Sequence, residues 1–131
     1  MRAVRVQNPE EFDQKLGEQL DNNVQHLFVL FFGTEDPATN ESWCPDCVIA
    51  DPAVRRAVSK IPDSVILECP ADRQAWKFGS EPHPYKVRED IKLERLPTLM
   101  RWGKNGVISR LVEEDCAKPD LLEKFVNEAL Q

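Results

Sequence analysis

The chain has 131 residues, of which 23 are acidic and 17 are basic, and its formal net charge at pH 7 is −6. This length allows one domain to bury a sizeable core without disulfides or metal ions to support it. The acidic balance argues against a nucleic-acid-binding protein and against one that docks on an anionic membrane surface.

The beginning of the chain shows no apolar stretch of the kind that secretory signals carry. The longest apolar run, residues 27–32, is much shorter than a membrane span. We therefore expect a cytoplasmic monomer with no membrane partner. In that compartment thiols stay reduced, and a Cys-x-x-Cys pair is more often redox-active or metal-binding than structural.

The first predicted elements are a short strand at residues 4–6 and a helix that begins after Asn8. Asn8 suits the N-cap, Pro9 suits the first helical position, and Glu11 completes a capping box. An apolar stripe with helical spacing follows, formed by Phe12, Leu16 and Leu20.

The apolar run at residues 26–32 predicts a strand that is buried on both faces. A polar loop at residues 33–42 then leads to a helix that runs from residue 44 to about 61 and ends before Pro62. Pro52 lacks a backbone N–H, so we expect a kink there. The side chains predicted to face inward are Cys47, Val54, Val58 and Ile61.

Residues 65–67 predict the next buried strand. The segment 70–84 is dense in proline, glycine and charge, which predicts irregular structure, and a short helix is expected from residue 85 to about 91. Strands at residues 98–102 and 107–111 flank an Asn-Gly turn and predict a hairpin.

A last helix is predicted from about Pro119, with an apolar face formed by Leu121, Leu122, Phe125, Val126 and Leu130. The complete order is β-α-β-α-β-α-β-β-α. It predicts one α/β domain over residues 1–131, with three layers (α/β/α) around a central mixed sheet.

Cys44 and Cys47 form a Cys-x-x-Cys pair between the buried strand and the second helix. The free N–H groups and the dipole of a helix N-terminus stabilise a thiolate, which is the species that attacks disulfides. A second thiol one turn further on can resolve the mixed disulfide. We therefore predict that Cys44 is the exposed nucleophile and that Cys47 resolves.

Three neighbours of the pair have predicted roles. Pro45 starts the helix, where its missing N–H costs nothing, and stiffens the ring that the disulfide closes. The Asp46 carboxylate disfavours the thiolate, which indicates a reductant rather than an oxidase or isomerase, although it also suits the helix dipole. Trp43 offers a flat apolar wall to substrate or simply belongs to the core.

A structural disulfide and a metal site are the alternatives for the two thiols. Zinc would need two more ligands from Cys69, Cys116, His26 and His83. These residues lie singly on separate elements without a second paired spacing, so no metal is predicted. Cys69 and Cys116 are expected to behave as small buried hydrophobic residues.

The order of elements, the Cys-x-x-Cys pair, Pro52 eight residues after Cys44, and Pro97 before a hairpin strand together resemble thioredoxin. The run Trp-Cys-Pro-Asp-Cys, the long loop before it and the pair Trp76-Lys77 resemble the 14-kDa thioredoxin-related family (thioredoxin-domain-containing protein 17). The resemblance spans nearly the whole chain.

This resemblance implies a disulfide reductase that binds no cofactor and is recharged by thioredoxin reductase with electrons from NADPH. It also implies activity on small-molecule or protein disulfides and on peroxides. Leu96-Pro97 resembles the cis-proline segment that faces the cysteines, with the Leu96 backbone pairing with substrate. Thioredoxins carry a buried aspartate before the motif, whereas this chain has Leu30 and Phe31 there, so that role is vacant or taken by Asp46.

A binding module remains an alternative, namely a thioredoxin-fold adaptor whose dithiol switches its affinity for a partner protein. The segments 33–42 and 70–84 are longer than usual connections. We expect them to border the face that presents Cys44, to carry acidic side chains there, and to narrow the substrate range by excluding bulky or acidic proteins.

Overall fold

The computed structural model describes residues 1–131 and contains one five-stranded mixed sheet with the strand order β1-β3-β2-β4-β5. The parallel part consists of β1 (Arg2–Arg5), β3 (Ser64–Ala71) and β2 (His26–Gly33). The hairpin of β4 (Thr98–Gly103) and β5 (Gly106–Val112) completes the sheet, because β4 pairs antiparallel with β2. The predicted α/β class and mixed sheet are confirmed.

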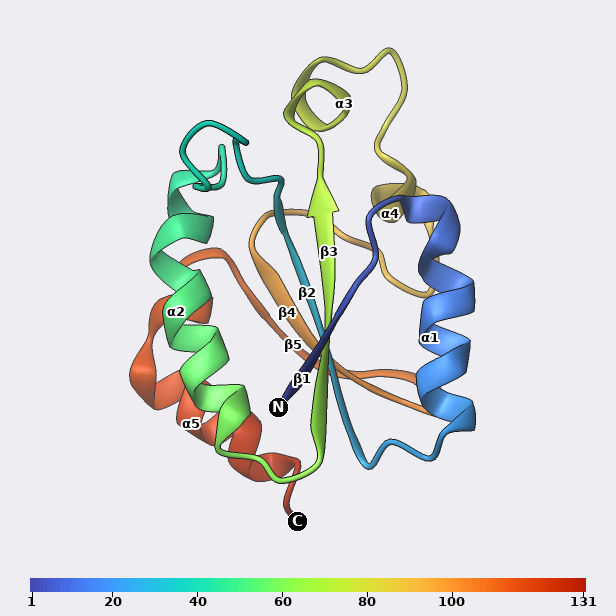
Figure 1. The fold of residues 1–131 in the computed structure, drawn as a ribbon, viewed down its shortest axis with the longest axis vertical. Helices are drawn as coiled ribbons and strands as arrows, with labels where there is room; N and C mark the ends of the chain where they lie inside the picture. Colours follow the sequence, from blue (N-terminus) through green and yellow to red (C-terminus); the bar gives the residue numbers. More distant parts are fainter.

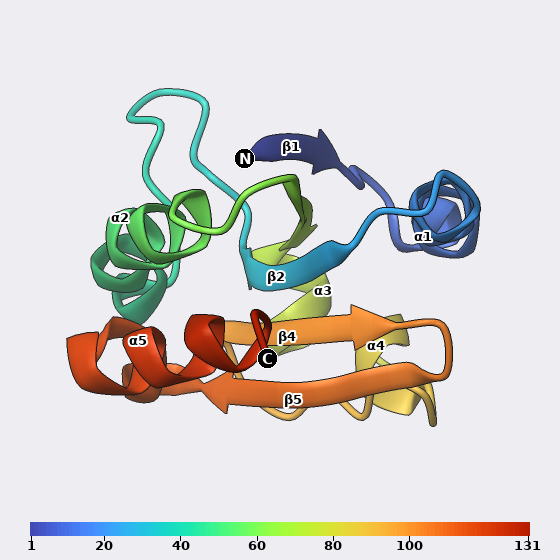
Figure 2. The ribbon, with the colours of Figure 1, turned by 90° about the horizontal axis from the view of Figure 1, so that it is seen from below.

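Helices cover both faces of the sheet (Figures 1 and 2). One face carries α1 (Phe12–Asp21) and α4 (Pro84–Val87), and the other carries α2 (Pro45–Ser59) and α5 (Pro119–Glu128). A further short helix, α3 (Arg73–Phe78), follows the carboxyl end of β3. The structure therefore has the three layers that the sequence predicted.

Two 3-10 turns join these elements. η1 (Pro9–Glu11) precedes α1, and η2 (Glu113–Ala117) precedes α5. The Glu11 carboxylate accepts a hydrogen bond from the Asn8 N–H at 3.1 Å, as the predicted capping box requires.

The core lies on both sides of β2, whose residues 27–33 are all buried. Successive side chains of a strand point to opposite faces, so Phe31 meets the α1 layer and Phe28 meets the α5 layer. The Phe12 ring of α1 lies 6.1 Å from Phe31 and the Phe28 ring lies 6.1 Å from Phe125, between ring centroids. Phe12 also has edge contacts with Tyr85 and Trp102.

The segment after β3 differs from the prediction. It was expected to be irregular, but β3 extends to Ala71 and α3 follows, because the Asp72 side chain caps this helix by accepting from the Ala75 N–H at 3.1 Å. The expected helix over residues 85–91 is shorter and earlier, as α4, since Arg88 is already extended.

Two smaller expectations also need correction. The hairpin turn is centred on Lys104 and Asn105 rather than on Asn-Gly, and Gly106 opens β5 with a φ of +110°. α2 ends at Ser59, two residues before the expected limit, and includes Pro52, where the kink stays a prediction. No helix in the structure is both long enough and apolar enough to span a bilayer.

The central position of Phe12 leads to a stability prediction. Phe12→Ala should lower the free energy of unfolding by about 3–5 kcal/mol, because it leaves a cavity against three aromatic rings. Urea denaturation followed by circular dichroism measures this. The matched control is Phe78→Ala, since Phe78 is 59% exposed and its loss should cost less than about 0.5 kcal/mol. Equal losses in the two variants would contradict this account of the core.

Candidate redox-active dithiol site

The two cysteines of the motif lie where β2 ends and α2 begins, at the carboxyl edge of the parallel strands (Figure 1). Cys44 is the N-cap residue of α2, with extended backbone angles, and Pro45 occupies the first helical position as predicted. Cys47 follows in the first turn, and its N–H donates to the Cys44 carbonyl at 3.0 Å. The helix start therefore holds both sulfurs together.

The surroundings of Cys44 favour its thiolate. A hydrogen bond from the Cys47 thiol, together with the N–H groups of Cys47 and Asp46, lowers the pKa of Cys44 to about 7. Burial and the charge of the Asp46 carboxylate oppose this shift. Asp46 thus acts on the Cys44 pKa in the predicted direction, and Cys44 is substantially ionised near neutral pH.

Cys47 has the opposite character. Its thiol donates to Cys44 and is buried, and these two effects raise its pKa far above the ordinary value. The Gly33 N–H, which points at the Cys47 sulfur from 3.5 Å, and the Ser42 hydroxyl partly oppose this rise. Near neutral pH the pair therefore shares one proton, which resides on Cys47.

The expectation that Cys44 is exposed is wrong. Cys44 retains 7% of its accessible surface, against 2% for Cys47. The segment before β4 covers it, because the Cys44 sulfur lies 3.8 Å from the Leu96 carbonyl oxygen. The distinction between the two thiols rests on their pKa values more than on their exposure.

The predicted substrate-binding residues surround Cys44. The Leu96–Pro97 peptide bond is cis, as the resemblance implied, and the Leu96 carbonyl faces the sulfur. Trp43 is half-buried, and its indole N–H donates to the carbonyl of Ala71 at 2.8 Å. The structure thus brings all the predicted site residues to one place, while their roles toward substrate stay predictions.

One ring face of Trp43 is not a bare apolar wall. The ammonium group of Lys77, from α3, lies 5.5 Å from the centroid of the Trp43 ring. The segment that was expected to add acidic charge therefore also places a cation beside the motif.

Two of the acidic side chains expected near the site, Glu35 and Glu68, are paired with arginines. Arg5 binds the carboxylate of Glu35 at 2.6 Å, and Arg55 binds Glu68 at 2.6 Å and Asp51 at 3.0 Å. This network joins the strands β1 and β3 to α2 and to the loop that follows β2. It offsets the charge of those two carboxylates, and the acidic barrier stays a prediction.

No acid from β2 reaches Cys47, in agreement with the apolar residues Leu30 and Phe31 noted in the sequence. Leu30 pairs in register with Glu68 of the neighbouring strand, but both arginines hold that carboxylate. Asp46 acts on the Cys44 pKa rather than on that of Cys47.

The two remaining cysteines are fully buried thiols. Cys69 and Cys116 have no accessible surface, and burial raises the pKa of the Cys116 thiol to about 12 and that of Cys69 still further. No group of three or more potential metal ligands gathers anywhere in the chain. His83 instead caps α4, where its ring nitrogen accepts from the Tyr85 N–H at 3.2 Å.

Sequence reasoning missed Gly33 and Ser42. The Ser42 hydroxyl donates to the Gly33 carbonyl at 2.6 Å and accepts from the Cys44 N–H at 3.1 Å. A Cβ at position 33 would lie 2.7 Å from the Trp43 ring and 2.9 Å from the Ser42 oxygen, so a glycine is needed there. A glycine at the end of a buried strand was the available signal for such a close approach.

A mixed sheet with a dithiol at the N-terminus of a covering helix and a cis-proline opposite it defines a thioredoxin-type protein. Spinach chloroplast thioredoxin f, for example, shares this fold with a TM-score of 0.65 at 14% identity, over 99% of this chain and 88% of that one.

The chain belongs to the thioredoxin domain-containing protein 17-like family, whose thioredoxin-domain model matches residues 5–128. It is 33% identical to the thioredoxin-like protein Clot of Arabidopsis thaliana, over 88% of each chain. It is 36% identical to thioredoxin domain-containing protein 17 of Epinephelus coioides, over 95% of this chain and 94% of that one. Family and fold support a thioredoxin-type redox function.

The effect of Asp46 on Cys44 can be tested by charge removal. Asp46→Asn should lower the Cys44 pKa, by ~0.5 unit, because it removes a nearby negative charge while keeping the side-chain shape. The rate of iodoacetamide alkylation as a function of pH reports this pKa, and in the wild type it should rise through pH of about 7. Asp120→Asn, in the distant α5, is the control. An identical midpoint in all three proteins would show that Asp46 does not tune the thiolate.

Proposed function

We propose that this protein is a thiol-disulfide oxidoreductase that reduces small-molecule or protein disulfides through Cys44 and Cys47. The observation that carries the proposal is the division of one proton between the two sulfurs, which leaves Cys44 ionised near neutral pH. A thiolate near its working pH combines a useful ionised fraction with good nucleophilicity.

The reaction proceeds in two exchange steps. The Cys44 thiolate attacks one sulfur of the substrate disulfide, forming a mixed disulfide and expelling the first substrate thiolate, which takes a proton from solvent. Cys47 then loses its proton and attacks the Cys44 sulfur. The Cys44–Cys47 disulfide forms, the second substrate thiolate leaves, and two electrons have passed to the substrate.

The Asp46 charge supports the reducing direction. A carboxylate near Cys44 destabilises the thiolate of the reduced protein. The reduced pair therefore gives up its electrons more readily. We propose that thioredoxin reductase returns the disulfide to the dithiol at the expense of NADPH, in the cytoplasm, with no cofactor bound to this chain. The same Cys44 thiolate would attack peroxides, releasing an alcohol or water, after which Cys47 would condense with the resulting sulfenic acid and release water.

A coupled assay tests this function. With thioredoxin reductase and NADPH, the wild type should turn over cystine many times, and Cys44→Ser and Cys47→Ser should lose at least ~10²-fold of that rate because each lacks one exchange step. Cys69→Ala, which replaces a buried cysteine, is the matched control and should keep its activity. Mass spectrometry without reductant should find a mixed disulfide on Cys44 in Cys47→Ser.

The adaptor alternative gives a different result in the same assay. An adaptor would bind a partner differently in its oxidised and reduced states but would consume no NADPH beyond one reduction per protein molecule. Absence of turnover on every disulfide tested, cystine and insulin included, would rule out the reductase.

A further inference from the structure

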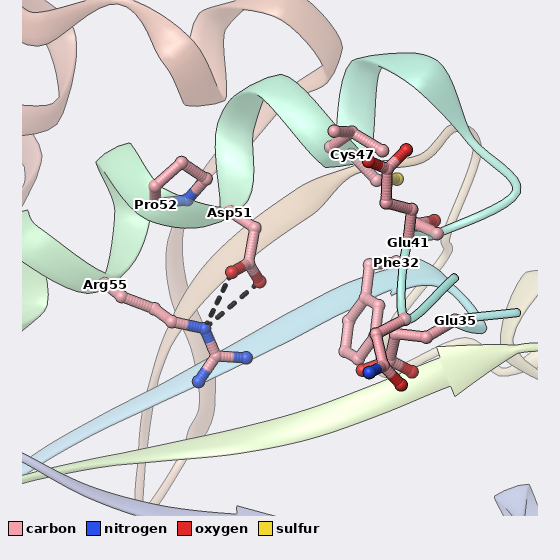
Figure 3. Close-up of a pocket in the computed structure, with 10 residues that line it drawn as sticks. Phe32, Glu35, Glu41, Cys47, Asp51, Pro52 and Arg55 are labelled. Carbon is pink, nitrogen blue, oxygen red and sulfur yellow. Dashed lines mark hydrogen bonds and ion pairs between the residues drawn. The ribbon is translucent and has the colours of Figure 1, made fainter. Parts of the chain in front are cut away.

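A cavity of about 220 Å³ with both polar and apolar walls opens beside Cys47, between α2 and the loop that follows β2 (Figure 3). Its volume is enough for several water molecules at roughly 30 Å³ each. The chemically active groups on its wall are Ser42, Cys47, Glu35, Glu41, Asp51 and Arg55. Water in this cavity can therefore approach the Cys47 thiol.

The resolving step presents Cys47 with a difficulty. Its sulfur must become a thiolate inside the protein, where burial disfavours the charge, and β2 supplies no acid to receive the proton. Once Cys44 is in a mixed disulfide, its negative charge no longer holds the proton on Cys47. The groups left to stabilise the Cys47 thiolate are then local hydrogen-bond donors.

One such donor points at Cys47, and a second lies beside it. The Gly33 N–H points at the sulfur from 3.5 Å. The Ser42 side chain lines the same cavity as Cys47, its hydroxyl bonds the carbonyl of that same Gly33, and hydrogen bonding by Ser42 is among the effects that lower the pKa of the Cys47 thiol. Its hydroxyl proton is engaged with the Gly33 carbonyl, 2.6 Å away, while the Cys44 N–H donates to the hydroxyl oxygen.

A serine hydroxyl has one proton and rotates freely about its C–O bond, so it can donate to either of two nearby acceptors. The neutral Gly33 carbonyl is the acceptor while Cys47 is a thiol. A thiolate is the stronger acceptor, because hydrogen bonds to charged groups exceed those to neutral groups. The charge state of Cys47 thus decides where the Ser42 proton points.

We propose that Ser42 is the switchable hydrogen-bond donor that stabilises the Cys47 thiolate in the resolving step, with the adjoining cavity as the exit for the Cys47 proton. The inference rests on the proposed function. When Cys47 attacks the Cys44 sulfur, its proton leaves to water in the cavity and is finally taken up by the departing substrate thiolate. The Ser42 hydroxyl turns from the Gly33 carbonyl to Cys47 and returns when the new disulfide neutralises the sulfur.

The charges around Cys47 are compatible with this role. Glu35 is paired with Arg5, and Asp51 is paired with Arg55. Figure 3 shows the Asp51 and Arg55 side chains joined along α2. Glu41 makes no ion pair, is exposed, and lines the same cavity. On the other side of Cys47 lies Cys44, which is neutral in the mixed disulfide.

The test separates the two exchange steps with the chromogenic disulfide 5,5′-dithiobis(2-nitrobenzoate). Mixed with one equivalent of this reagent, the reduced protein should release a first thionitrobenzoate as Cys44 attacks and a second as Cys47 resolves. Stopped-flow absorbance over a range of pH gives the apparent pKa of the second phase. Cys47→Ser, which lacks that phase, identifies it.

The variants Ser42→Thr and Ser42→Val form a matched pair, because they have the same shape and differ in the hydroxyl. In Ser42→Val the second phase should be about tenfold slower below its midpoint, and the midpoint should rise by about one pH unit. Ser42→Thr should stay within about threefold of the wild type. Ser42→Ala, which removes the hydroxyl without added bulk, should behave as Ser42→Val, and the first phase should change little in all three.

A purely structural role of Ser42 would slow the second phase without moving its pH midpoint. Equal midpoints in Ser42→Val, Ser42→Ala and the wild type would therefore overturn the inference, as would equal rates in the threonine and valine variants. If the wild type itself released no second thionitrobenzoate, the proposed function would fail instead, because Cys47 would not resolve.

Discussion

The parallel pairing of β2 with β3 is the constraint on which the site depends. It runs in register from His26 and Ser64 to Gly33 and Ala71, so both strands end at the same edge of the sheet. The carbonyls at these two ends are the acceptors that hold the motif, since Ala71 accepts from the Trp43 indole and Gly33 accepts from Ser42. A shift of one residue in this register would turn the side chains of β2 to the opposite layers and would separate these acceptors from the start of α2.

The chemistry of the site follows from the position of one proton. The first turn of α2 and the Cys47 thiol stabilise negative charge on Cys44, whereas burial and Cys44 itself keep Cys47 protonated. In the proposed reaction, charge must move from the first sulfur to the second, and the donors around each sulfur are different. Backbone N–H groups of α2 serve Cys44, and the end of β2 with the loop before the motif serves Cys47.

The ion pairs beside the cavity contribute little to the free energy of unfolding, and their main effect is to hold neighbouring elements in place. Arg5 and Arg55 tie Glu35, Asp51 and Glu68 together, although most of these side chains are partly exposed. Partly exposed ion pairs contribute little stability each, because water screens them. Their arrangement nevertheless links the loop that carries Ser42 to α2 and to two strands, and so keeps the motif and the cavity wall in a fixed relation.

The sequence by itself determined the class of fold, the helix start at Cys44 and Pro45, the buried strand β2 and the position of the Cys-x-x-Cys pair. These features depend on local signals, namely apolar periodicity, helix capping and the Cys-x-x-Cys spacing, which are readable over a few residues. The hairpin and α5 were also predicted, with the turn displaced by one residue. The helix α3 was missed because a single capping residue, Asp72, outweighed a segment rich in turn-forming residues.

The tertiary structure alone decided the burial of Cys44, the cation beside Trp43 and the contacts of Ser42. Each depends on contacts between residues distant in the chain: Leu96 with Cys44, Lys77 with Trp43, and Gly33 with Ser42 and Cys47. No local pattern encodes such contacts, because they arise only when the strand register brings separate loops to the same edge of the sheet. The sequence therefore identified the two thiols, and the packing around them set the environment that distinguishes one from the other.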